Sequence, residues 1–136
     1  MRFAKLVLFT LLAFSPSAFA KPHALTATSL DQLKAEAQKL ERTLANAGDC
    51  EFKVEETRDG LTLRIRDSRH TNAYLDVPAE AAISLEEELL GGDGSAARIF
   101  TIIGQGSLRL VHANDAFERA ELTDRDGRLL SCELDL

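Results

Sequence analysis

The chain contains few of the residues that most often carry binding or catalytic chemistry. It has no tryptophan and a single tyrosine, Tyr74, so its composition indicates no aromatic platform for stacking sugars or bases. A Gly-x-Ser-x-Gly nucleophile motif, a His-Glu-x-x-His zinc motif and a Cys-x-x-Cys redox motif are all missing. No familiar catalytic template therefore fits the sequence.

The chain also lacks an apolar run long enough for a membrane-spanning helix, which needs roughly 20 residues. Its longest run, Leu6–Phe14, covers nine residues and includes one threonine. Arg2 and Lys5 precede this run, and a Ser-Pro-Ser segment ends it. This order of basic, apolar and small residues predicts a secretory signal peptide over residues 1–20.

Ala18 and Ala20 supply the small side chains that a signal peptidase reads, so we expect cleavage after Ala20. Lys21 follows that cut, at the position where a lipid anchor would require cysteine. We therefore expect a periplasmic or secreted protein with no membrane span and no lipid anchor. Residues 21–28 show no periodicity and are predicted to be a short leader, followed by a single domain over residues 29–136.

Basic residues are outnumbered by acidic ones. Residues 1–20 contain two of the 16 basic residues and none of the 22 acidic ones, so the mature chain has a net charge of −8. Such a domain gains nothing from the release of phosphate counterions, which argues against nucleic acid as a partner. The same charge disfavours anionic lipid surfaces. Acidity of this size is also typical of ordinary solubility and does not define an acidic recognition face.

Only two cysteines are present, Cys50 and Cys132, and both belong to the mature chain. Zinc normally takes four ligands, and no histidine lies at ligand spacing from either cysteine. In an oxidising compartment, two cysteines in a small exported domain most simply form one disulfide. Closing the long loop between residues 50 and 132 stabilises the fold by about 4.5 kcal/mol in the chain-entropy model. Two free buried thiols are the alternative.

One helix is indicated after the leader. Ser29 is a favourable N-cap, and Gln32 stands three residues later, as in a capping box. Apolar residues then recur at intervals of three and four, at Leu30, Leu33, Ala37, Leu40, Leu44 and Ala47. This spacing predicts an amphipathic helix over residues 30–47 with one buried face.

The period changes to two after the helix, which indicates strands. Apolar and charged side chains alternate over residues 50–55 and 61–66, on either side of a two-residue Asp59-Gly60 loop that would pair Val54 with Ile65. Further strands are predicted over residues 71–77, 99–103, 108–111, 117–123 and 129–135.

The loop between the last two strands defines their register. Arg125-Asp126-Gly127 suits a three-residue loop with glycine in the left-handed position. That loop places Cys132 opposite Ala120 and leaves room beside this small residue for a disulfide.

Between the third and fourth strands, residues 79–90 are predicted to form a short second helix, because Pro78 ends a strand and Ala82, Leu85 and Leu89 share a helical face. The short links between strands favour antiparallel pairing. The predicted fold class is α+β, with an N-terminal amphipathic helix packed on a largely antiparallel sheet of about six to seven strands and a short second helix mid-chain.

Histidines are the remaining candidates for chemistry. His70 lies at a strand end, and His112 ends an alternating strand shortly before Asp115. If the fold brought these three residues together, they could form an acid–base group or supply metal ligands. Nothing in their spacing requires this, and the alternative is histidines that only form hydrogen bonds. No cofactor is indicated.

Two classes of function remain open. The first is an exported, non-catalytic module that binds a protein or a cell-envelope component, such as an inhibitor, an immunity-type protein or an envelope assembly adaptor. Charges of alternating sign on the first hairpin could form its binding face or simply be solvated, at Glu51, Lys53, Glu55, Arg64 and Arg66. The second is a small periplasmic hydrolase or metal-dependent enzyme that uses His70 and His112.

Overall fold

The computed structural model describes residues 23–47, 50–91, 94–114 and 116–134, so the predicted signal peptide lies outside the described residues. The described chain forms one helix, α4 (Leu30–Ala47), and nine strands. The first five of these strands along the chain are β2 (His23–Thr28), β3 (Glu51–Thr57), β4 (Gly60–Arg66), β5 (Asn72–Pro78) and β6 (Ile83–Leu89). Four follow: β7 (Ser95–Ile102), β8 (Gly106–Ala113), β9 (Ala116–Thr123) and β10 (Leu129–Glu133).

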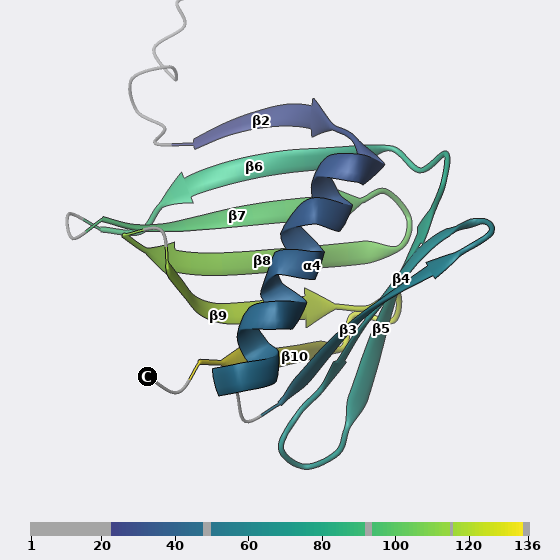
Figure 1. Cartoon of the computed structure of the whole chain (residues 1–136). Helices are drawn as coiled ribbons and strands as arrows, with labels where there is room; N and C mark the ends of the chain where they lie inside the picture. Colours follow the sequence, from purple (N-terminus) through teal and green to yellow (C-terminus); the bar gives the residue numbers. More distant parts are fainter. Residues whose placement is uncertain (1–22, 48–49, 92–93, 115, 135–136) are drawn as a thin grey trace, which may run out of the picture.

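The strands form two antiparallel sheets. The large sheet has the order β10-β9-β8-β7-β6-β2, and the small sheet has the order β3-β4-β5. Helix α4 crosses one face of the large sheet, and the small sheet stands beside the β9–β10 side (Figure 1). No helix in the described ranges is long and apolar enough to cross a membrane.

A single hydrophobic core joins the helix to both sheets. The largest fully buried side chains come from all three, and include Leu33 and Leu40 of α4, Leu63 and Leu75 of the small sheet, and Phe100, Leu108 and Leu122 of the large sheet. The small sheet is therefore held in place by burial of its inner face as well as by its covalent connections.

The helix predicted over residues 30–47 forms with those bounds. The Ser29 hydroxyl accepts a hydrogen bond from the backbone N–H of Gln32 at 3.1 Å, which satisfies one donor of the first turn. However, α4 is not the first element of the fold. Residues 23–28, predicted to be a leader, form β2 and pair with β6. The six residues of this strand, His-Ala-Leu-Thr-Ala-Thr, alternate too weakly to indicate a strand by themselves.

The prediction of a second helix over residues 79–90 is wrong. Residues 83–89 form strand β6, which pairs with β2 on one side and with β7 on the other. Ile83 and Leu85 face the core at the period of a strand, while the remainder of β6 is largely glutamate. Tertiary pairing overrides local propensity here, and the described residues form nine strands in two sheets instead of six or seven in one.

The register of the first hairpin differs from its prediction by two residues. Thr57 lies opposite Gly60, so the loop consists of Arg58 and Asp59, and Val54 pairs with Leu63. A shift of two residues keeps every side chain on its predicted face, since the side-chain period of a strand is two. Gly60 is required in this register, because an added Cβ would lie 2.0 Å from the carbonyl oxygen of Val77.

The register of the last hairpin is confirmed. Cys132 pairs with Ala120, as the three-residue loop predicts. Gly127 has a φ of 85°, and its N–H donates to the carbonyl oxygen of Asp124 at 3.0 Å. The left-handed glycine therefore closes the loop as expected.

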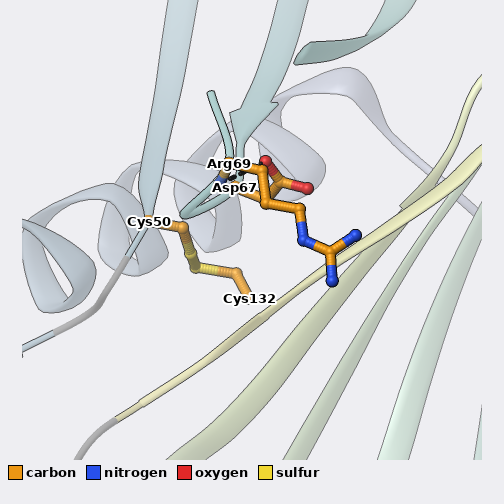
Figure 2. Close-up of a disulfide and its surroundings, with 4 residues drawn as sticks. All are labelled: Cys50, Asp67, Arg69 and Cys132. Carbon is orange, nitrogen blue, oxygen red and sulfur yellow. Dashed lines mark hydrogen bonds between the residues drawn. A yellow bond between two sulfur atoms is a disulfide. The ribbon is translucent and has the colours of Figure 1, made fainter. Parts of the chain in front are cut away.

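Cys50 and Cys132 are joined in a disulfide, with their Cα atoms 5.9 Å apart (Figure 2). Cys50 immediately precedes β3 and Cys132 lies in β10, so the bond ties the small sheet to the edge of the large one. The neighbouring turn of the small sheet is built by Asp67, whose carboxylate accepts hydrogen bonds from the backbone N–H groups of Arg69 and Thr71.

Candidate functional site

The small sheet has one face in the core and one face toward solvent. Side chains alternate along each strand, so residues between the buried positions point outward. We call this surface the outer face; it consists of Glu51, Lys53, Glu55, Thr62, Arg64, Arg66, Asn72, Tyr74 and Asp76. The pairing aligns these residues in three rows across the sheet, and the middle row is Lys53, Arg64 and Tyr74.

Most charges at the two ends of the outer face have partners. The Glu51 carboxylate lies 2.8 Å from a terminal nitrogen of Arg64 and 4.0 Å from one of Arg66. At the opposite end, the Thr62 hydroxyl donates to the Asp76 carboxylate at 3.1 Å. Exposed pairs of this kind contribute little to stability, so their main effect is to order the side chains.

The middle row is different because some of its polar groups have no ion-pair or hydrogen-bond partner among the described residues. Lys53 has no ion-pair partner in the described part of the chain. Arg64 Nε is buried and has no hydrogen-bond partner among the described residues. Tyr74, the only tyrosine of the protein, is 52% exposed. Lys53 and Tyr74 thus place an ammonium group and a half-exposed ring on either side of Arg64, whose guanidinium contacts Glu51.

A groove of about 350 Å³ lies along this row. It is lined by Glu41, Lys53, Val54, Glu55, Thr62, Arg64 and Tyr74. Helix α4 provides one wall, because Glu41 accepts a hydrogen bond from the backbone N–H of Val54 at 3.0 Å. This contact also occupies an outward N–H on the edge of β3. The groove therefore combines cationic donors, carboxylate acceptors and a ring, which suits binding through hydrogen bonds and aromatic contact.

The sequence predicted part of this site. Alternation placed the charges of the first hairpin on one polar face, and Tyr74 stands between Ala73 and Leu75, which are both buried. Glu41 was not predictable from its position in the sequence, because its role depends on how α4 lies against β3.

The candidate histidines belong to different parts of the fold. His70 is exposed in the turn between β4 and β5, with a φ of 65°, and its backbone N–H donates to Asp67. It lines a shallow hollow of about 320 Å³ together with Cys50. His112 lies near the end of β8, and no hydrogen bond or ring contact joins it to His70 in the described structure.

The His112 ring packs against Phe117 edge to face, with the ring centroids 6.4 Å apart. Its Nε2 is buried and has no hydrogen-bond partner among the described residues. Asp115, the third residue of this candidate group, lies outside the described residues. No group of three histidine, cysteine, aspartate or glutamate side chains in the described ranges is placed to hold a metal ion.

Comparisons of the chain with protein-family models, with curated proteins and with solved structures found no match. The interpretation of the site therefore depends on its own geometry.

Proposed function

We propose that the protein is an exported, non-catalytic binding module that takes a protein or cell-envelope component on the outer face of its small sheet. The observation that carries this proposal is the middle row, where Tyr74 is 52% exposed and Lys53 has no ion-pair partner among the described residues. An inhibitor, an immunity-type protein or an envelope assembly adaptor would each use such a surface.

Physical chemistry favours this row as the centre of an interface. Tyrosine and arginine are enriched among the residues that dominate binding free energy. A tyrosine gives a large contact area while only two side-chain torsions are immobilised. The supporting sheet is fixed by the core and by the Cys50–Cys132 disulfide, so little conformational entropy is lost on binding.

Export is the part of the proposal that the sequence supports best. The basic, apolar and small residues of positions 1–20 favour delivery to the periplasm or to the medium, with cleavage after Ala20. A disulfide is compatible with such a compartment, because cytosolic proteins rarely keep one.

Affinity capture from a native envelope fraction tests the binding site. The mature protein is immobilised alongside two variants, Tyr74→Ala and Leu129→Ala; Leu129 is a matched control because it is 56% exposed on the large sheet. We expect a partner that the wild type and Leu129→Ala retain and that Tyr74→Ala binds at least about tenfold more weakly. Equal capture by all three proteins would place the interface elsewhere.

The enzymatic alternative has its own test in the same preparations. It requires His70 and His112 to act in one site. Hydrolysis or metal-dependent turnover that each of the substitutions His70→Ala and His112→Ala abolishes in folded protein would favour it over binding alone.

A further inference from the structure

The two cysteines of the disulfide differ in how far they are buried. Cys132 is 2% exposed and belongs to the core that the helix shares with both sheets. Cys50 is half-buried and packs against that core. Thiol–disulfide exchange begins when a thiolate attacks one sulfur of the bond, so access decides which of the two sulfurs is attacked. In this fold the accessible side of the bond is Cys50.

Two surface hollows border Cys50. The smaller one, of about 320 Å³, is lined by Cys50, Glu51, Arg66, Asp67, Ser68 and His70. The larger one, of about 650 Å³, lies between α4 and β3, and its lining includes Leu44, Cys50 and Phe52. Cys132 lines neither of them. Since one water molecule occupies about 30 Å³ in the liquid, both hollows have room for a small thiol.

The turn that walls the smaller hollow is held in one conformation. The Asp67 carboxylate accepts hydrogen bonds from the backbone N–H groups of Arg69 and Thr71, and the His70 N–H donates to the Asp67 carbonyl oxygen at 3.0 Å. His70 has a φ of 65°, a left-handed conformation that a non-glycine residue keeps only where its surroundings hold it. This turn lies beside Cys50 (Figure 2). The hollow is therefore a fixed feature of the folded protein.

The charges around the smaller hollow do not oppose an anionic thiolate. The Glu51 carboxylate lies 2.8 Å from a nitrogen of Arg64 and 4.0 Å from one of Arg66, so its charge is compensated. The Asp67 carboxylate is engaged by two backbone N–H groups. Arg66 itself lines the hollow. A thiolate, which is the reactive form of a thiol, therefore meets a guanidinium group and no lining carboxylate without a partner.

Other contacts hold the small sheet when the bond is open. Its inner face is buried in the shared core. Glu41 of α4 accepts a hydrogen bond from the backbone N–H of Val54 at 3.0 Å, and Arg128 donates to the carbonyl oxygen of Asn72 at 3.2 Å. A buried free cysteine behaves as a small apolar residue, so Cys132 can stay in the core as a thiol. Opening the bond thus removes the covalent tie between the sheets while their packing persists.

We propose that the Cys50–Cys132 bond is an exchange site for thiol reductants, which attack the folded protein at Cys50 through the hollows beside it. One thiolate of a dithiol bonds to Cys50 Sγ, the bond between the two cysteines breaks, and Cys132 Sγ leaves as a thiolate. The second thiolate of the reductant then displaces Cys50 Sγ, so the reductant is oxidised to a disulfide and two electrons pass to the protein. The two protons that the dithiol gives up end on the two cysteines.

The bond is therefore a reducible clasp between the two sheets. This inference goes beyond the function proposed for the outer face and does not depend on it.

Reduction of the folded wild type tests whether the bond opens without unfolding. The mature protein is treated with dithiothreitol, alkylated at intervals, and its thiols are counted by intact mass. We expect a rate that is proportional to the dithiol concentration and that changes by less than about twofold in urea below the unfolding transition. A bond that is accessible only in the unfolded protein is instead reduced steeply faster as urea is added, because the free energy of unfolding falls linearly with urea.

Two single-cysteine variants test which sulfur is accessible. Cys132→Ala leaves Cys50 and Cys50→Ala leaves Cys132, and since both variants lack the same disulfide, each is the control for the other. We expect the Cys50 thiol to react with an aromatic disulfide reagent at least about tenfold faster than the Cys132 thiol, and both to react at similar rates in denaturant. The wild type answers the same question without a variant: in excess monothiol, peptide mapping should find the mixed disulfide on Cys50.

Three results would overturn the proposal. The first is a reduction rate that rises with urea in step with unfolding. The second is equal reactivity of the two thiols in the folded variants, or a mixed disulfide of the wild type that lies mainly on Cys132. The third is loss of the far-ultraviolet circular dichroism of the folded protein on reduction, since the bond would then be a requirement of the fold and not a clasp within it.

Discussion

Leu40 is fully buried in the core that α4 shares with the two sheets. Truncation to alanine removes its contacts and leaves a cavity that close-packed neighbours fill only in part. We expect Leu40→Ala to lower the free energy of unfolding by about 2–5 kcal/mol in urea titrations. Leu129→Ala is the control, since its side chain is 56% exposed and should cost less than about 0.5 kcal/mol. A similar small loss for Leu40→Ala would contradict the observed packing.

Gly60 and Gly127 allow a comparison of two glycines with positive φ. Gly60 has a φ of 146° and no room for a Cβ, whereas Gly127 has a φ of 85° and no heavy atom within 4 Å of that position. We expect Gly127→Ala to cost about 1 kcal/mol, from backbone strain alone. Gly60→Ala should cost more than about 2 kcal/mol, because a Cβ also collides with the backbone of β5. Thermal unfolding measures the difference, and equal losses would rule out the close approach at Gly60.

At the scale of elements, the sequence predicted those strands in which one face is buried and the other is polar. The strand at residues 72–78 shows this alternation clearly, and so does the hairpin closed by Gly127. The segments 23–28 and 83–89 were mistaken for a leader and a helix. Their strand state depends on pairing with each other and with β7, which is information that no local pattern contains.

The same limit applies to the candidate site. Lys53 and Arg64 were predictable as members of a polar face, because both alternate with apolar neighbours in a hairpin. The groove itself was not predictable, since one of its walls comes from Glu41 on a helix. Nor does the sequence show that His70 lies in a turn of the small sheet while His112 lies in a strand of the large one, because that separation follows from the overall topology.

An ion pair links the helix to the large sheet. Arg98 of β7 lies 2.6 Å from the Glu36 carboxylate of α4, and both side chains are less than one-third exposed. A double-mutant cycle with Glu36→Gln and Arg98→Met should give a coupling free energy of about 1 kcal/mol, decreasing with added salt. The Lys34–Glu56 pair is more exposed and provides the control, with a smaller expected coupling. Zero coupling for the first pair would show that it does not orient α4.

At the scale of the whole molecule, the proposed export and the disulfide are linked. If the signal peptide is removed as proposed, the native protein begins at Lys21, two residues before β2. Intact-mass analysis of protein from its own compartment should therefore give the mass of residues 21–136. A retained Met1 on a protein found in the cytosol would contradict both the cleavage and the supply of an oxidising environment.

The disulfide should be the largest single contribution to stability that a chemical reagent can remove. It spans 82 residues and joins the small sheet to the edge of the large one, so it restricts the unfolded chain over most of the domain. Reduction should lower the free energy of unfolding by up to about 4.5 kcal/mol in the chain-entropy model. The double variant Cys50→Ala, Cys132→Ala should match the reduced wild type, and adding a reductant to it should change nothing.

Non-reducing peptide mapping of native protein must show the Cys50–Cys132 link, and two free thiols would refute it. A preparation from a reducing cytosol should consequently unfold more readily, and its small sheet should present Tyr74 and Lys53 less rigidly to a partner.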